Sequence, residues 1–342
     1  MSTITSAPAA RDEDLDSPAR EPELGPRGRP GKLGRVFGVV GVLLVVQATL
    51  VAAFVVPGHK PEPHGVDIGL VGTSAAVSAV EAQSPGAFDV HTYSTEAEAR
   101  RAIEHRDLYG AVVTDGARSR LLVASAASAP IAHMLQATFA PGGDAVEVAD
   151  LKPLDEDDPA GATLSLLFLP LVVVCLPAIL LLSTLRLSAA GMIGAVALFA
   201  TLGGLAVVAL VGKWIGAMPG PYLKLAGVAA LTIFAIAMVV AGLERLLGHA
   251  GIGLGFLLFF LVGNPASANG TSPDVLPSFW RQISQYMPNG AGGTGLRNTA
   301  YFDSNAMARP LSVLSAYALA GVLLLLAGEA VRRRRSSALA HA

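Results

Sequence analysis

The chain has little charge and almost no cysteine. Charged residues make up 15% of its 342 positions, and Cys175 is the only cysteine, so no disulfide can form within one copy. The motifs GxxxxGK[ST], CxxC, HExxH and GxSxG are also missing. Their absence excludes ATP hydrolysis by this chain and leaves nucleophilic and zinc-dependent catalysis without support. We therefore expect a protein that is not an enzyme, with no catalytic, metal-binding or cofactor-binding residues.

Ionisable side chains are missing from the middle of six long apolar runs. The runs cover residues 36–56, 162–185, 187–211, 222–243, 246–263 and 311–328. Each is long enough for a helix that crosses a hydrocarbon layer of about 30 Å, where a backbone must satisfy its own hydrogen bonds. The sequence predicts an α-helical, multi-pass membrane protein with six spans. The lack of buried charges disfavours proton-coupled antiport and favours an apolar or amphipathic cargo.

Basic residues flank both ends of this array. Four precede the first run, and four more follow the last at positions 332–335. The positive-inside rule then places both termini in the cytoplasm of a plasma-membrane protein, which agrees with an even number of spans. Residues 57–161, with 16 Asp and Glu against 7 Lys and Arg, are expected on the exoplasmic side.

The same pattern predicts the domain boundaries. Residues 1–34 are expected to be a disordered cytoplasmic tail. Residues 35–56 form the first transmembrane helix, longer than the roughly 7–15-residue core of a signal peptide, so an uncleaved anchor is favoured. A five-helix bundle follows at 162–330, and 331–342 form a basic cytoplasmic tail.

The exoplasmic segment alternates short β-rich runs with helical patterns in the order βαβαββαβ. This order predicts an α/β domain with a partly parallel sheet. Thr95 and Glu98 form a candidate capping box at the start of the second helix. With about a hundred residues and no disulfide, we expect the domain to rest on its own core.

A few polar groups leave alternatives open. His59 and His64 flank two prolines and are either metal ligands or parts of a solvated linker. The acidic run at 155–158 either binds a cation loosely or forms a solvated collar before the next span. Gln47 is the only strongly polar side chain deep in a run, and it either contacts a neighbouring helix or is merely tolerated.

The connection at 264–309, between the last two spans, is unusually aromatic for an exposed loop. Residues 277–287 have amphipathic character, and Trp and Tyr favour the lipid–water boundary. We expect a short interfacial or re-entrant helix there, a turn at 288–293, and a second short helix that carries Arg297. The hairpin is either an outer gate or an interfacial anchor, and its candidate residues are Asn264, Pro265, Pro277, Trp280, Pro288 and Arg297.

These residues also carry a family resemblance. Across residues 33–330 the chain resembles the type-2 ABC exporter permeases, in their bacterial phage-infection-protein-like branch. The resemblance lies in one span, an insert containing EARRAIEHRDLYGAVVTD at 98–115, five further spans, and the motifs GNP at 263–265, LPSFW at 276–280 and MPNG at 287–290. The chain differs from the family in its Pro-rich tail and in the short link at 183–190.

The resemblance implies a permease component of an exporter, energised by a separate ATPase subunit and assembled as a homodimer or heterodimer in membrane lipid. No nucleic acid is expected as a partner. The alternative is a surface scaffold or receptor that does not transport and binds a protein or an envelope component through its exoplasmic domain.

Overall fold

The computed structural model describes residues 32–59, 62–116, 118–140 and 146–340. The tail predicted to be disordered lies outside these ranges except for its last three residues, which already belong to helix α1 (Lys32–His59). The chain divides between Thr49 and Leu50 into two units, and α1 contains the division. Every strand and every other helix of the described residues belongs to the second unit, Leu50–Ala342.

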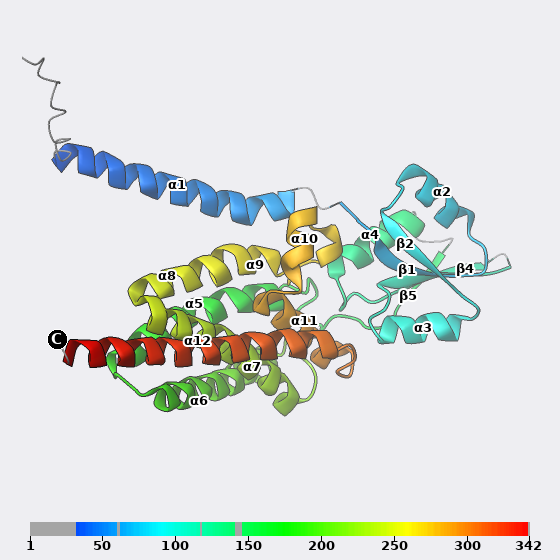
Figure 1. Ribbon diagram of the computed structural model, residues 1–342. Helices are drawn as coiled ribbons and strands as arrows, with labels where there is room; N and C mark the ends of the chain where they lie inside the picture. The colour runs from blue at the N-terminus through cyan, green and yellow to red at the C-terminus, as the bar shows by residue number, and fades with distance from the viewer. Residues whose placement is uncertain (1–31, 60–61, 117, 141–145, 341–342) are drawn as a thin grey trace, which may run out of the picture. The chain divides into compact units, whose positions relative to one another are not determined.

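The segment after α1 folds around a five-stranded sheet (Figure 1). The strands run in the order β2-β1-β3-β4-β5, and every neighbouring pair is parallel except the β3–β4 hairpin. The partly parallel sheet predicted from the sequence is confirmed. The strand and helix bounds are β1 (Val66–Val71), α2 (Ala75–Gln83), β2 (Phe88–Tyr93), α3 (Glu96–Glu104), β3 (Gly110–Asp115), β4 (Arg118–Val123), α4 (Ala129–Phe139) and β5 (Val146–Asp150).

Helix α3 begins where its capping residues predict. The Thr95 hydroxyl accepts the Glu98 N–H at 3.3 Å, and the Glu98 carboxylate accepts the Ser94 N–H at 3.1 Å, one residue before the position expected for a capping box. Ala99, Ala102 and Ile103 form the buried stripe of the helix. This stripe fixes α3 against one face of the sheet and so places the turn that comes after it.

Five helices among the described residues are long and apolar enough to cross a membrane. Their most exposed side chains are mainly leucines, as lipid contact requires, so the chain is a mostly helical, multi-pass membrane protein. The sixth span, at α1, stays a prediction. The five are α5 (Thr163–Thr184), α6 (Ala189–Val208) continued by η1 (Ala209–Ile215), α7 (Tyr222–Leu247), α8 (His249–Phe256) continued by η2 (Leu257–Val262) and α9 (Gly263–Ala266), and α12 (Ala308–Ala340).

Helix α7 is the centre of the bundle. It is buried along most of its length and contacts α5, α6, α8 and α12. Two glycines allow the closest approach: a Cβ on Gly242 would lie 2.6 Å from the Leu324 Cβ, and one on Gly321 would lie 2.5 Å from the Met238 carbonyl carbon. Small residues at such crossings are how membrane helices pack without a hydrophobic driving force.

The connection between the last two spans is a set of short helices: η3 (Pro273–Val275), α10 (Ser278–Ser284) and α11 (Pro288–Tyr301). The turn predicted at 288–293 is wrong, because these residues form the first half of α11. Pro288 occupies its first turn, where a missing N–H has no cost. The glycines that suggested a turn instead allow close packing, since a Cβ on Gly292 would lie 2.7 Å from Thr232.

The connection also completes the core of the α/β domain. Val275 packs with Val66, Ile68 and Val112 on one side of the sheet. Phe302, fully buried, packs with Ile103 on the other. The expectation of a self-contained core is therefore wrong, because two residues of the connection, more than a hundred positions later in the chain, form part of the domain's core.

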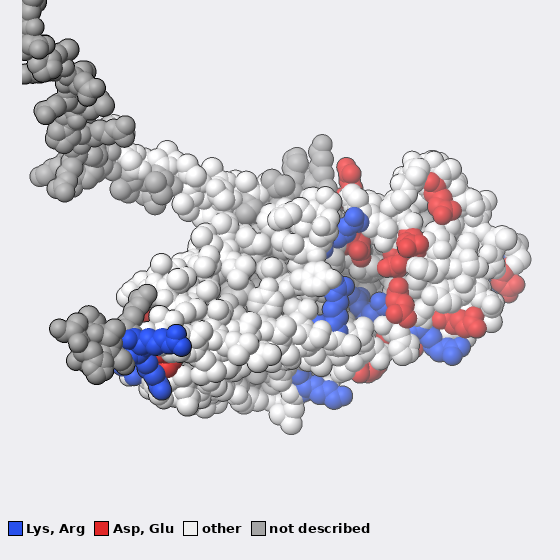
Figure 2. All heavy atoms as spheres, in the orientation of Figure 1, with Lys and Arg blue, Asp and Glu red and all other residues white. Residues whose placement is uncertain are grey.

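Charged groups are unevenly distributed along this unit. On the face shown in Figure 2 they gather over the α/β domain, along its border with the bundle, and at the C-terminal end of α12. We call these two ends of the bundle the domain end and the tail end. Between them the described surface of the spans carries no charged atoms in this view.

Candidate functional site

Arg297 lies on α11 at the domain end, with only 8% of its surface exposed. Its Nη2 donates to the Asn269 carbonyl oxygen at 2.6 Å. The Asn269 side chain in turn donates to the Asn289 carbonyl at 3.3 Å, and the Asn289 side chain donates to the Phe259 carbonyl in η2 at 3.0 Å. This buried polar seam holds α11 in place between the 268–271 loop and a span.

The Arg297 guanidinium is poorly satisfied for a buried charge. It has five N–H donors, yet the bond to Asn269 is the only side-chain hydrogen bond assigned to it among the described residues. None of the ion pairs in the described part of the chain includes it. Burial, and then the nearby charge of Arg106, lowers the pKa of Arg297 to about 10, so the group is still a cation at neutral pH. An unpaired ion held this way costs several kcal/mol, on the order of the penalties measured for buried charges.

A second, partly buried arginine lies close by. Arg106 follows α3 and has a backbone φ of 70°, a left-handed conformation uncommon outside glycine. Its guanidinium carbon lies 4.8 Å from the centre of the Phe302 ring and 5.8 Å from that of Tyr109. Burial lowers the pKa of Arg106 as well. Aromatic faces stabilise this cation by about 1 kcal/mol each but supply no acceptor for its N–H groups.

The acidic groups nearby are engaged elsewhere. The Asp274 carboxylate accepts from the Tyr109 hydroxyl at 2.8 Å and from the Ser272 hydroxyl at 3.2 Å. Burial raises the pKa of Asp274, and these two hydrogen bonds oppose the shift. Burial and the neighbouring Asp274 charge raise the pKa of Tyr109 far above its usual value, so it stays a neutral donor. This clamp joins the α/β domain to the connection.

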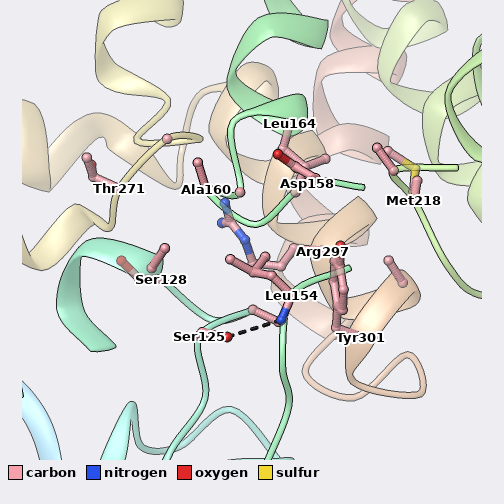
Figure 3. A pocket seen from close by; sticks show the side chains of 16 residues that line it. Ser125, Ser128, Leu154, Asp158, Ala160, Leu164, Met218, Thr271, Arg297 and Tyr301 are labelled. Carbon is pink, nitrogen blue, oxygen red and sulfur yellow. Dashed lines mark hydrogen bonds between the residues drawn. The ribbon is translucent and has the colours of Figure 1, made fainter. Parts of the chain in front are cut away.

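Asp158 is the other buried acid near Arg297. Its two carboxylate oxygens accept the N–H groups of Ala162 and Thr163, at 2.9 and 3.0 Å, so it caps the start of α5. Figure 3 shows the Arg297 side chain extending from α11 toward the segment that carries Ala160 and Asp158. The space around them measures about 20 Å³, enough for a single water.

The larger space beside Arg297 is a polar cavity of about 330 Å³. Its walls come from the turn after α3, the 268–274 segment, α11 and the start of α12. Two further wall residues, Ala268 and Ala306, have positive φ angles of 53° and 52°. The charged and hydrogen-bonding side chains that line it are Asp67, Arg106, Tyr109, Thr271, Ser272, Asp274, Gln285, Thr294, Arg297, Asn298 and Arg309.

The other residues predicted for the hairpin are spread over its elements. Asn264 and Pro265 belong to α9 and line a separate groove of about 410 Å³. Pro277 precedes α10, and Pro288 begins α11. Trp280 is half-buried, with its ring centre 5.4 Å from that of Phe279, and does not line the cavity beside Arg297. Of the six candidates, only Arg297 lies at this cavity. Gln47 has an exposed side chain on α1, and its predicted contact stays a prediction.

Sequence reasoning missed Arg106, Tyr109 and Asp274. The first two lie in the segment 98–115, which was singled out only for family likeness, and Asp274 is separated from them by about 165 positions. Sequence spacing gave no signal for their contact. Charge patterning alone also failed, because Arg106 is one of several arginines around α3.

One group in the described residues has spacing suited to a metal ion: Asp67, Asp89 and His91, whose ligand atoms lie within 4.8 Å of one another. The His91 ring nitrogen lies 2.9 Å from the Asp67 carboxylate, and both side chains are well exposed. Of the histidine pair considered from the sequence, His64 has its Nδ1 2.6 Å from the Glu62 carbonyl oxygen. An internal partner for His64 favours the linker interpretation.

Comparison of the chain with models of protein families, with curated proteins and with solved structures finds no match. The resemblance to exporter permeases therefore stays a prediction from the sequence motifs.

Proposed function

We propose that this chain is the permease-like membrane component of an exporter for an apolar or amphipathic substrate, energised by a separate ATPase. In this proposal the protein lies in the plasma membrane, with α1 as the first of six spans. The α/β domain is exoplasmic, and both termini lie in the cytoplasm. The domain end of the bundle is then the outer end.

The observation that carries the proposal is the placement of α11. Its 14 residues cover about 21 Å at 1.5 Å per residue, too short for a span of about 30 Å. Yet α11 is buried against α5, α7 and α12, and it carries a charged residue beside a cavity. Irregular or short elements at membrane depth are tolerated where they are buried in protein or line a cavity, as in transporters. A re-entrant helix held by hydrogen bonds to a covering domain is a suitable gate.

Three spans add support for a moving part. Both η1 and η2 are π-helical segments, and the second span contains Pro170 and Pro177. Such departures from regular helix frequently occur at functional sites. The η2 segment carries the Phe259 carbonyl that binds Asn289, so a change in this segment would act directly on α11.

The tail end offers a surface for the ATPase. An open hollow of about 920 Å³ lies between the α5–α6 link and the end of α12, lined by groups that include Arg186, Glu244, Arg245 and Glu329. Arg186 is exposed at the tip of the link, with a backbone φ of 49°. A charged hollow formed by several spans suits a partner whose movement must reach the bundle.

Co-purification is the deciding experiment. We expect the tagged chain to retain an ATPase subunit, and the charge reversal Arg186→Glu to release it. Arg118→Glu, an equal change at an exposed site on β4, should not. Retention of exoplasmic proteins alone, with no ATPase, would support the scaffold function instead and contradict the permease.

Topology and gating have their own tests. In a chain without Cys175, a thiol reagent added outside the cell should label a cysteine at Ser84 and not one at Ser336; the reverse pattern contradicts the orientation. Arg297→Ala and Trp280→Ala should lower export at normal membrane abundance if the hairpin is a gate. Loss of abundance in both variants indicates an anchor, and no effect in either variant contradicts the assignment.

A further inference from the structure

The cavity beside Arg297 is lined by three arginines and two aspartates, and none of the three arginines belongs to an ion pair assigned to the described residues. Arg106, Arg297 and Arg309 line it. The Arg106 and Arg297 side chains are absent from the ion pairs assigned to the described residues, and Arg309 lies with its guanidinium carbon 4.9 Å from the centre of the Tyr286 ring. Each arginine therefore has N–H donors left over at or near the same space.

The acids of the cavity do not fill this role. Asp274 accepts two hydroxyl hydrogen bonds, and Asp67 lies 2.9 Å from the His91 ring nitrogen. Asp158, on the other side of Arg297, accepts two backbone N–H groups at the start of α5. Asp67 and Asp274 keep their negative charge in these contacts, but neither forms an ion pair with an arginine among the described residues, so the guanidinium N–H groups remain available donors.

Arg106, which is partly buried, and Arg297, which is buried, come from different parts of the chain and are held together by packing. The Arg106 guanidinium lies over the ring of Phe302, and Phe302 follows Arg297 by five residues. The α/β domain and α11 therefore bring both cations to the same cavity. Besides burial, which lowers both pKa values, the nearby charge of Arg106 lowers the pKa of Arg297, whereas the charge of Asp274 raises that of Arg106. An anion between them removes both the repulsion and the unsatisfied donors.

We propose that this cavity binds a phosphate group between Arg106 and Arg297. The planar guanidinium presents paired donors that match phosphate oxygens, and it remains charged when buried. At about 330 Å³ the cavity lies in the range of ligand sites and exceeds what a bare phosphate needs, so the group belongs to a small organic phosphate or a lipid head, or is a free phosphate with water. This inference adds a class of ligand to the site of the proposed permease. It depends on the proposed function only for the location of the cavity at the membrane surface.

Binding is tested on the purified full chain in a neutral detergent. Thermal unfolding is followed while inorganic phosphate is added, with sodium chloride at matched ionic strength as the reference. For the wild type and for Arg118→Gln, which changes an exposed arginine at the start of β4, we expect unfolding midpoints that rise and saturate. For Arg106→Gln and Arg297→Gln, half-saturation should require at least about ten times more phosphate, the loss expected when one of two charged donors to the same anion is removed.

A second arm distinguishes the lipid source. The chain is reconstituted in vesicles of equal phosphatidylcholine and phosphatidylglycerol, extracted again, and its retained lipid is measured by mass spectrometry. Retention of phosphatidylglycerol by the wild type and Arg118→Gln, but not by the two cavity variants, identifies a lipid phosphate. Saturation with inorganic phosphate and no lipid retention identifies a soluble one.

The proposal is overturned if the wild type shows neither response, or if both cavity variants bind as Arg118→Gln does. Should a Gln variant fail to fold, judged by its unfolding without phosphate, Arg106→Lys and Arg297→Lys keep the charge and lose the paired geometry. These are expected to weaken binding by a smaller factor, and unchanged binding in both overturns the site. Absence of export by the wild type, with phosphate binding intact, contradicts the permease function alone.

Discussion

Replacing Phe302 by alanine should destabilise the α/β domain more than any comparable change on the connection. Phe302 is fully buried in the core beside Ala99, Ile103 and Leu108, although it belongs to the connection and not to the domain's own segment. Its ring also lies 4.8 Å from the Arg106 guanidinium. The substitution removes both contacts at once.

The magnitude is set by the burial of the ring. A buried Phe→Ala change costs about 3–5 kcal/mol, through lost transfer energy and the cavity left behind. Loss of the cation–π contact adds about 1 kcal/mol, as expected for a cation that is only partly buried. A total of roughly 4–6 kcal/mol is a large share of the 5–15 kcal/mol that stabilises a typical domain.

The assay is limited proteolysis and thermal unfolding of the purified chain in detergent. We expect cleavage within residues 62–150 to accelerate and the first unfolding transition to fall. Phe279→Ala is the matched control, because the same side chain there is 62% exposed and its loss should change little. Equal effects of the two substitutions would refute the reasoning that Phe302 completes the domain's core.

Three further outcomes are expected. Arg245→Met should lower the free energy of unfolding by roughly 1–3 kcal/mol, because it removes the 2.8 Å ion pair with Glu329 and leaves that carboxylate with the exposed Arg333 at 3.4 Å. The double change Arg245→Met with Glu329→Leu should recover most of the loss, and additive effects would contradict the pairing. Burial raises the pKa of Asp274, so its carboxylate costs stability at pH 7 and this cost falls as the group is protonated between about pH 7 and about pH 4. Asp274→Asn should therefore unfold at a higher temperature than the wild type at pH 7, by a margin that shrinks over that range. A difference that does not change with pH would contradict the raised pKa. Gly321→Leu should abolish stable insertion or cost at least about 1–3 kcal/mol, because α7 leaves no room for a Cβ there, while Gly194→Leu, which meets open space, should be tolerated; equal abundance of both would contradict the crossing.

The fold was largely readable from the sequence, because its signals are local. Apolar runs predicted the five spans to within a few residues, and the alternation of runs predicted the sheet. The prediction of a turn at 288–293 was wrong because glycine is common both in turns and where helices pack closely. The contact of Gly292 with Thr232, which the sequence does not show, identifies the second case. Arg297 was predicted because it falls on the second short helix expected in the aromatic connection. Arg106, Tyr109 and Asp274 were not, since their meeting depends on how the α/β domain packs on residues far along the chain.

The long sequence separation of Phe302 from its core has a consequence for biosynthesis. The last strand of the sheet ends at Asp150, yet the aromatic ring that fills the α3 side of the domain is translated about 150 residues later, after four spans. At about 5–20 residues per second, a ribosome reaches Phe302 roughly 8–30 s after it finishes the sheet. During that interval the sheet is complete in hydrogen bonds but open on one face, so we expect this domain to need a chaperone or a folding catalyst until the final hairpin arrives.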